Sequence, residues 1–155
     1  GLITYRTEGT NKWISPSFKK PELLNKGYPR LKSPVERLIY VSPPPFHDSA
    51  LPKSGVLALA DISMVGANEQ DGATAISKKA GTQIPAAEII SEQDFRDFGG
   101  HILEVWSYNP ILLANNGRVD DISLLLSLED NPNERIQMGL DDIREKHELP
   151  IKHEE

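Results

Sequence analysis

The sequence predicts an α/β or α+β fold, in which a small sheet packs with helices and a β-hairpin precedes it. Runs rich in β-branched and aromatic residues alternate with runs that are apolar at helical spacing. Residues 101–143 combine a buried strand, a turn and two capped helices, and the fold is organised around them. The 155 residues can bury one sizeable core.

The chain begins with a predicted hairpin. Residues 2–6 and 12–15 favour strands, and the polar loop between them contains Gly9, which can supply a positive φ. Arg6 and Lys12 lie on the two arms, with Thr10 and Asn11 near the tip. A basic hairpin of this kind can contact the phosphates of a duplex, with little information about the bases. The alternative is an ordinary surface hairpin.

Residues 16–34 contain four prolines and predict a linker that carries one short helix. Pro21 is expected at the first helical position of this helix and Gly27 just past its end. Residues 35–41 predict a strand, and residues 43–45, all proline, predict an extended loop.

The middle of the chain predicts short elements. Residues 54–65 are apolar at helical spacing, with Ser54 as a possible N-cap. Residues 73–77 predict a strand of small residues, after which residues 78–81 turn the chain back. Residues 86–90 are ambiguous and are assigned as a possible strand.

A run of caps marks the last third of the chain. Residues 91–94 form a capping box that opens a helix ending at Gly99 and Gly100. Residues 101–106 predict a strand whose side chains alternate between two faces. Asn109 and Pro110 are predicted to start a short helix, and Asp120 is predicted to cap a second, apolar helix. Residues 131–134 are predicted to open the last helix, with Asn131 as its cap. The apolar stripe of this last helix is formed by Ile136, Leu140 and Ile143.

These elements predict a hairpin over residues 1–15, a linker over 16–34, a domain over 35–148 and a polar tail over 149–155. The chain opens at Gly1 inside a strand without an initiator Met, so we expect the hairpin to be the remnant of a larger N-terminal domain.

Charge and composition restrict the function. Residues 1–40 carry eight Lys or Arg against three Glu, a net charge of +5, whereas the rest carries nine against twenty, a net charge of −11. This asymmetry indicates that only the N-terminal part could face a polyanion. The absence of cysteine excludes disulfides and thiolate chemistry and fits the cytoplasm. No run of 18 apolar residues and no secretory signal is present.

Candidate catalytic groups are few. A metal-dependent nuclease would need carboxylates from neighbouring elements, and Asp61, Glu88 and Glu104 are the available set. Glu104 is not followed by the lysine that such a site needs. His47 and Asp48 form an isolated pair without the spacing of a metal motif, so no metal or cofactor is predicted.

Two aromatic residues follow Glu104. Trp106 and Tyr108 could line a ligand or partner surface, or they could simply pack against a helix.

Four segments resemble a family of bacterial winged-helix regulators, distantly similar to the antitoxin of abortive-infection type IV toxin–antitoxin systems. They are residues 35–41, 54–64, 103–110 and 119–128. The sequence departs from the pattern at Asp121, where proline is usual, and near Ile62, where an aromatic is expected.

The resemblance implies a winged helix joined to an α/β domain. Residues 6–12 would be the wing that binds DNA, and the remainder would bind an effector, a protein partner or a second copy. The expectation is therefore a cytoplasmic, non-enzymatic part of a transcriptional regulator. The alternatives are a small metal-dependent nuclease and a toxin-binding antitoxin domain.

Overall fold

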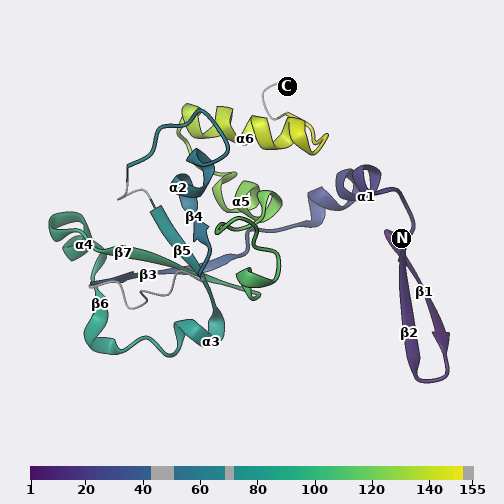
Figure 1. The fold of residues 1–155 in the computed structure, drawn as a ribbon, viewed down its shortest axis with the longest axis horizontal. Coiled ribbons are helices and arrows are strands. Elements are labelled where there is room, and N and C mark those ends of the chain that lie inside the picture. The colour runs from purple at the N-terminus through teal and green to yellow at the C-terminus, as the bar shows by residue number, and fades with distance from the viewer. Residues whose placement is uncertain (43–50, 69–71, 152–155) are drawn as a thin grey trace. The chain divides into compact units, whose positions relative to one another are not determined.

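The computed structural model describes residues 1–42, 51–68 and 72–151. The chain forms two compact units, one from residues 1–32 and 141–155 and the other from residues 33–140. Figure 1 shows a hairpin in the first unit and a sheet packed with helices in the second. The predicted mixed α/β fold is confirmed.

The first unit begins with strands β1 (Ile3–Glu8) and β2 (Asn11–Pro16), which pair antiparallel from Ile3 opposite Pro16 to Glu8 opposite Asn11. Gly9 and Thr10 form the two-residue turn, and Gly9 adopts a φ of 62° there. The hairpin is therefore longer, and its turn tighter, than the sequence predicted.

Helix α1 (Lys20–Gly27) and the 3-10 helix η1 (Tyr28–Arg30) follow. The helix begins at Lys20, one residue before the predicted start, and Gly27 lies inside it. The reason is that Lys19 adopts the extended conformation of an N-cap, which leaves Pro21 within the first turn. Asn25 Nδ2 donates to the backbone oxygen of Glu148 at 2.8 Å, which joins α1 to the C-terminal segment of the same unit.

The second unit is built on a five-stranded mixed sheet of order β4-β5-β7-β3-β6. Strand β7 is central, parallel to β5 and antiparallel to β3. The strands are β3 (Val35–Val41), β4 (Lys53–Ser54), β5 (Gly72–Ser77), β6 (Ile89–Ile90) and β7 (His101–Trp106).

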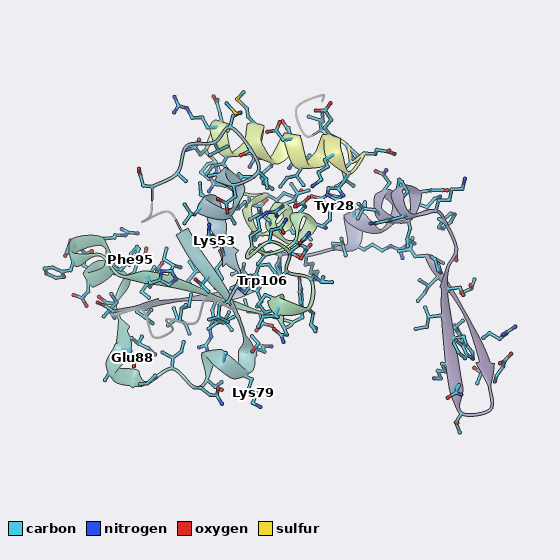
Figure 2. All side chains as sticks on the ribbon, viewed as in Figure 1. Tyr28, Lys53, Lys79, Glu88, Phe95 and Trp106 are labelled. Atoms are coloured by element: carbon cyan, nitrogen blue, oxygen red, sulfur yellow. The ribbon has the colours of Figure 1, made fainter. Side chains whose placement is uncertain are left out.

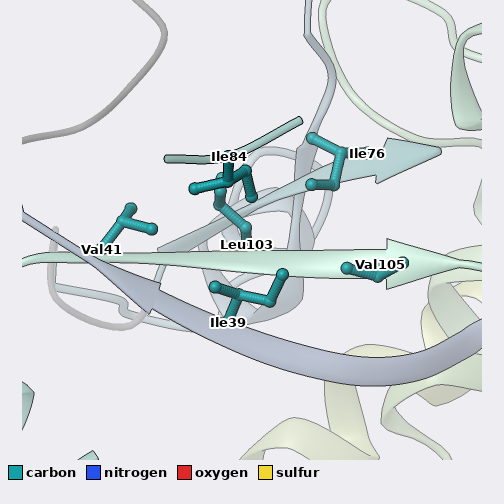
Figure 3. Packing of buried hydrophobic residues seen from close by; sticks show 6 residues of the cluster. All are labelled: Ile39, Val41, Ile76, Ile84, Leu103 and Val105. Atoms are coloured by element: carbon teal, nitrogen blue, oxygen red, sulfur yellow. The ribbon is translucent and has the colours of Figure 1, made fainter. Parts of the chain in front are cut away.

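From Leu103 to Trp106 strand β7 is buried on both faces, and its side chains alternate between these faces as predicted. On one face Leu103 and Val105 join a cluster of aliphatic side chains (Figure 3). On the other face lie Glu104 and Trp106, both buried. Figure 1 shows α2 (Gly55–Ala60) and α5 (Asp121–Leu128) on one side of the sheet and α3 (Lys78–Gly81) on the other. The cluster comprises Ile39, Val41, Ile76, Ile84, Leu103 and Val105.

The predicted helix over residues 54–65 is shorter in the structure. It ends at Ala60, and the Ser63 hydroxyl donates to the Leu59 carbonyl at 2.9 Å, so a side chain takes the place of a further helical turn. Ser54 stands at the N-cap position, but its side chain makes no capping hydrogen bond.

The predicted caps agree with the structure at two helices. The Ser91 hydroxyl accepts from Asp94 N at 3.0 Å and opens α4 (Glu92–Phe98), which ends at Gly99. Asp120 Oδ1 accepts from Ser123 N at 3.0 Å and opens α5.

The ambiguous segments mostly form single turns. Residues Ala86–Glu88 are the 3-10 helix η3, so only Ile89–Ile90 of the possible strand is paired. The short helix after Asn109 is the 3-10 helix η4 (Pro110–Leu112), in which Asn109 Oδ1 accepts from Ile111 N at 3.2 Å.

The predicted start of the last helix was wrong. Helix α6 (Glu134–Lys146) is capped by Asn133, whose Oδ1 accepts from Arg135 N at 2.9 Å. Asn131 instead accepts from Asn133 N at 3.0 Å in a preceding turn. Two nearby asparagines fit the same pattern, and the second is the cap because its carbonyl also accepts from Gln137 N. The predicted stripe of Ile136, Leu140 and Ile143 is buried.

Candidate nucleic-acid interface

The hairpin of the first unit carries the predicted DNA-binding residues, and every residue of both strands is exposed. Residues directly opposite each other in an antiparallel pair share a face of the ribbon, and successive residues alternate between faces. The register therefore assigns every side chain to one of two faces. The polar face carries Thr4 with Ser15, Arg6 with Trp13 and Glu8 with Asn11; the apolar face carries Ile3 with Pro16, Tyr5 with Ile14 and Thr7 with Lys12.

The four predicted residues are consequently not on one surface. Arg6 and Asn11 share the polar face, Lys12 lies on the apolar face, and Thr10 lies in the turn. The sequence located the arms of the hairpin but not its faces. The face on which a side chain lies depends on the register of the two strands, and the length of the turn sets this register. The sequence predicted a longer loop between the strands than the structure has.

The charges of the two faces differ as well. On the polar face, Arg6 Nη2 lies 2.9 Å from Glu8 Oε1, and both side chains are more than half exposed. An ion pair with that exposure contributes little to stability and exchanges readily with solvent or another anion. Lys12 shares its face with the exposed side chains of Ile3, Tyr5 and Ile14.

The hairpin also exposes two aromatic side chains that were not predicted as site residues. Tyr5 is 73% exposed on the apolar face, and Trp13 is 57% exposed on the polar face. Tyr5 adjoins the exposed Ile3 and Ile14 on its face, and a contiguous apolar surface of this kind marks an interaction site. The sequence contained the information needed to place these two aromatics. Once the two-residue turn is known, the alternation of side chains along residues 3–8 and 11–16 assigns Tyr5 and Trp13 to opposite faces.

Further cations lie on and beside helix α1. Lys26 is 3.8 Å from Glu22 and its ammonium lies 4.5 Å from the centre of the Phe18 ring. Lys19 and Lys20 are exposed at the start of the helix. The positive charge predicted for the N-terminal part is therefore at the surface of this unit.

The predicted ligand or partner residues belong to the second unit. Figure 2 labels Trp106 within the packed side chains of this unit. Its ring is fully buried and its Nε1 donates to Glu104 Oε2 at 3.0 Å. The Tyr108 ring meets it edge-on at 5.5 Å, and the Tyr108 hydroxyl is hydrogen-bonded to Ser123. Both aromatics pack against neighbouring side chains, and a role toward a ligand stays a prediction.

Burial dominates the electrostatics of this cluster. It raises the pKa of the Glu104 carboxyl, and the Trp106 indole and the nearby Ser54 hydroxyl oppose the rise. Ser54 Oγ is fully buried and lacks a hydrogen bond of good geometry within the described residues. Burial also raises the pKa of Tyr108, an effect opposed by the hydrogen bond with Ser123 and reinforced by the charge of Asp120.

The three carboxylates of the nuclease alternative do not converge. Asp61 is paired at 3.1 Å with Lys53 of edge strand β4, whereas Glu88 directly precedes the opposite edge strand β6. Three strands lie between these edges, a separation of roughly 19 Å at about 4.8 Å per strand, and Figure 2 shows the labelled Lys53 and Glu88 well apart. Within residues 1–42, 51–68 and 72–151, no group of His, Asp and Glu could hold a metal ion. His47 and Asp48 lie outside the described residues.

Comparisons of this chain with family models, with curated proteins and with solved structures gave no match. In the part of the chain that the structure describes, no helix is long and apolar enough to cross a membrane.

Proposed function

We propose that the first unit binds nucleic acid through the β1–β2 hairpin and that the chain is part of a DNA-binding transcriptional regulator. The observation that carries this proposal is the fully exposed ribbon, which bears Arg6 and Lys12 against one Glu, within an N-terminal segment rich in cations. Residues 1–32 contain seven Lys or Arg against two Glu, a net charge of +5. Residues 141–155 of the same unit carry three Lys or Arg against six Asp or Glu, so the unit as a whole has a net charge of +2 in a chain of −6. Neutralised phosphates release counterions, and this release supplies most of the affinity of such contacts.

The resemblance to winged-helix regulators supports the same proposal, since it implies that the hairpin is a wing. In this proposal the protein acts in the cytoplasm and catalyses no reaction. Residues 33–140 then bind an effector, a protein partner or a second copy.

One feature of the second unit supports a protein partner, as an antitoxin-like domain would need. Ile111, Leu112 and Leu113 are 49%, 74% and 57% exposed, three successive aliphatic side chains in solvent. Hydrogen bonds flank this segment, because Asn109 caps the turn that begins it and Asn115 and Arg118 exchange two backbone hydrogen bonds after it. An ordered apolar tip is typical of a protein contact.

The proposal is tested with the full chain and a pool of 20-base-pair duplexes of random sequence. We expect binding that weakens steeply with salt. The double variant Arg6→Ala with Lys12→Ala should reduce the slope of log K against log salt by up to about 1.8, or about 0.9 for each phosphate that is no longer neutralised. Fluorescence anisotropy at several salt concentrations measures this. Affinity and slope equal to those of the wild type would remove the hairpin from the interface.

A further inference from the structure

The two faces of the β1–β2 hairpin differ in what they offer to a duplex. We infer that the polar face enters the major groove, where Arg6 and Asn11 recognise base edges, while Lys12 on the other face contributes only charge. This inference rests on the proposed function and names the part of the nucleic acid that the hairpin recognises.

The dimensions of the hairpin favour the major groove. Two strands lie about 4.8 Å apart, and with side chains such a ribbon fits the major groove, about 12 Å wide, without the widening that the minor groove, about 6 Å wide, would need. Each strand has six residues, or roughly 20 Å at 3.4 Å per residue. The tight turn at Gly9 and Thr10 keeps the end of the ribbon narrow.

The chemistry of the polar face matches base edges. Arginine pairs with the O6 and N7 acceptors of guanine through two hydrogen bonds, and asparagine pairs in the same way with adenine. Arg6 and Asn11 lie on this face, on opposite strands and close to the turn. Trp13, directly opposite Arg6, adds an apolar surface of the kind that contacts a thymine methyl.

The apolar face offers fewer such contacts. Thr7 and Lys12 beside the turn and the Tyr5 hydroxyl can hydrogen-bond there, but Ile3 and Ile14 would cover base donors and acceptors that then lose their water without compensation. An isolated two-stranded hairpin is also marginal in water and needs its apolar side covered by protein. The apolar face is therefore better suited to protein, and the polar face is left for the duplex.

The Arg6–Glu8 pair does not prevent recognition. The pair is exposed, so Arg6 can exchange the carboxylate for a guanine edge at small cost.

The experiment uses the full chain and the tightest duplex selected from a random 20-base-pair pool, with a scrambled duplex of the same composition. The measured quantity is the ratio of the two dissociation constants. We expect Arg6→Ala and Asn11→Ala each to reduce this ratio by about fivefold to a hundredfold, the range for one bidentate contact. Lys12→Ala, which also removes one cation, should weaken both duplexes equally and leave the ratio unchanged.

Two further arms make the test independent of hairpin folding. Arg6→Lys keeps the charge and the strand but loses the planar fork, so it should lose discrimination while retaining the salt slope. Replacing the guanines by 7-deazaguanine removes the N7 acceptor from the major groove only. It should weaken the wild type and have little further effect on Arg6→Lys.

The outcomes separate the inference from the proposed function. Binding that does not discriminate, that ignores 7-deazaguanine, or whose discrimination depends on Lys12 overturns the inference alone. Failure of the wild type to bind any duplex at low salt overturns the proposed function as well.

Discussion

Two of the antiparallel strand pairs that the structure describes, β1–β2 and β3–β7, are similar in length but differ in their environments. In the β1–β2 pair every side chain is exposed, whereas in β7 of the β3–β7 pair Leu103 and Val105 are each 1% exposed and Trp106 is fully buried. The backbone pairing is the same kind of ladder in both. The two pairs differ in the surroundings of their side chains. Those of β7 are buried and contribute to folding, whereas those of the hairpin are exposed to solvent and are available for binding.

The two regions therefore contribute unequally to the free energy of folding. Burying apolar surface is worth about 25 cal/mol per Å², so the two buried faces of β7 hold a large share of the stability of the second unit. The hairpin has cross-strand pairs such as Tyr5 with Ile14, and each such pair contributes only roughly 0.2–1 kcal/mol. Substitutions in β7 should therefore change the stability of the protein, whereas substitutions in the hairpin should change its binding.

The largest effect is expected at the centre of β7. Leu103→Ala removes a side chain from the cluster in Figure 3 and should lower the free energy of unfolding by about 2–5 kcal/mol. Urea unfolding followed by circular dichroism measures the change. DNA binding under conditions in which the variant is folded should equal that of the wild type.

The matched control is Leu38→Ala. Leu38 lies on the neighbouring strand β3 and is 47% exposed, so its loss should cost less than about 1 kcal/mol. Equal costs for the two leucines would contradict the assignment of Leu103 to the core.

The second effect concerns the buried carboxyl behind the same strand. Burial raises the folded-state pKa of Glu104 above its ordinary value of 4.5, so the folded protein holds this proton more tightly than the unfolded chain does. The stabilising contribution is complete below pH 4.5 and is lost as the pH rises through the raised pKa. Glu104→Gln should remove this dependence, and its stability should increase relative to the wild type over that range.

The comparison is made by urea unfolding at several pH values, from about 4, below the ordinary pKa of 4.5, up to about 8. Glutamine still offers an oxygen to the Trp106 indole, so the packing is conserved in the variant. The control is Glu145→Gln, an exposed carboxylate on α6. A constant difference between wild type and Glu104→Gln across the range would show that Glu104 titrates as an exposed group does.

Much of this fold could be predicted from local sequence patterns. The capping residues Ser91 and Asp120 were identified because an N-cap is decided by a few neighbouring residues. The two faces of β7 followed from the alternation of side chains. The start of α6 was missed because Asn131 and Asn133 both satisfy the local pattern, and only the backbone hydrogen bonds distinguish them.

The candidate site was harder to predict because it depends on pairing. The sequence placed Arg6 and Lys12 on the arms of one hairpin, but a turn of two residues puts them on opposite faces. The alternative set of Asp61, Glu88 and Glu104 failed for a related reason. Strand order, which no local pattern determines, separates Asp61 and Glu88 to opposite edges of the sheet.

The smallest effect distinguishes the roles of charge within the hairpin. Glu8→Gln removes the partner of Arg6 and one negative charge from the polar face, so duplex binding should become about 1.4-fold to fivefold tighter, as for the loss of one exposed ion pair of about 0.2–1 kcal/mol. Glu22→Gln on α1, whose carboxylate is 3.8 Å from Lys26, changes the net charge equally and is the control. Anisotropy titrations at one salt concentration compare the two. Equal gains would mean that only net charge matters, whereas weaker binding of Glu8→Gln would mean that the carboxylate itself accepts a hydrogen bond from a cytosine amino group.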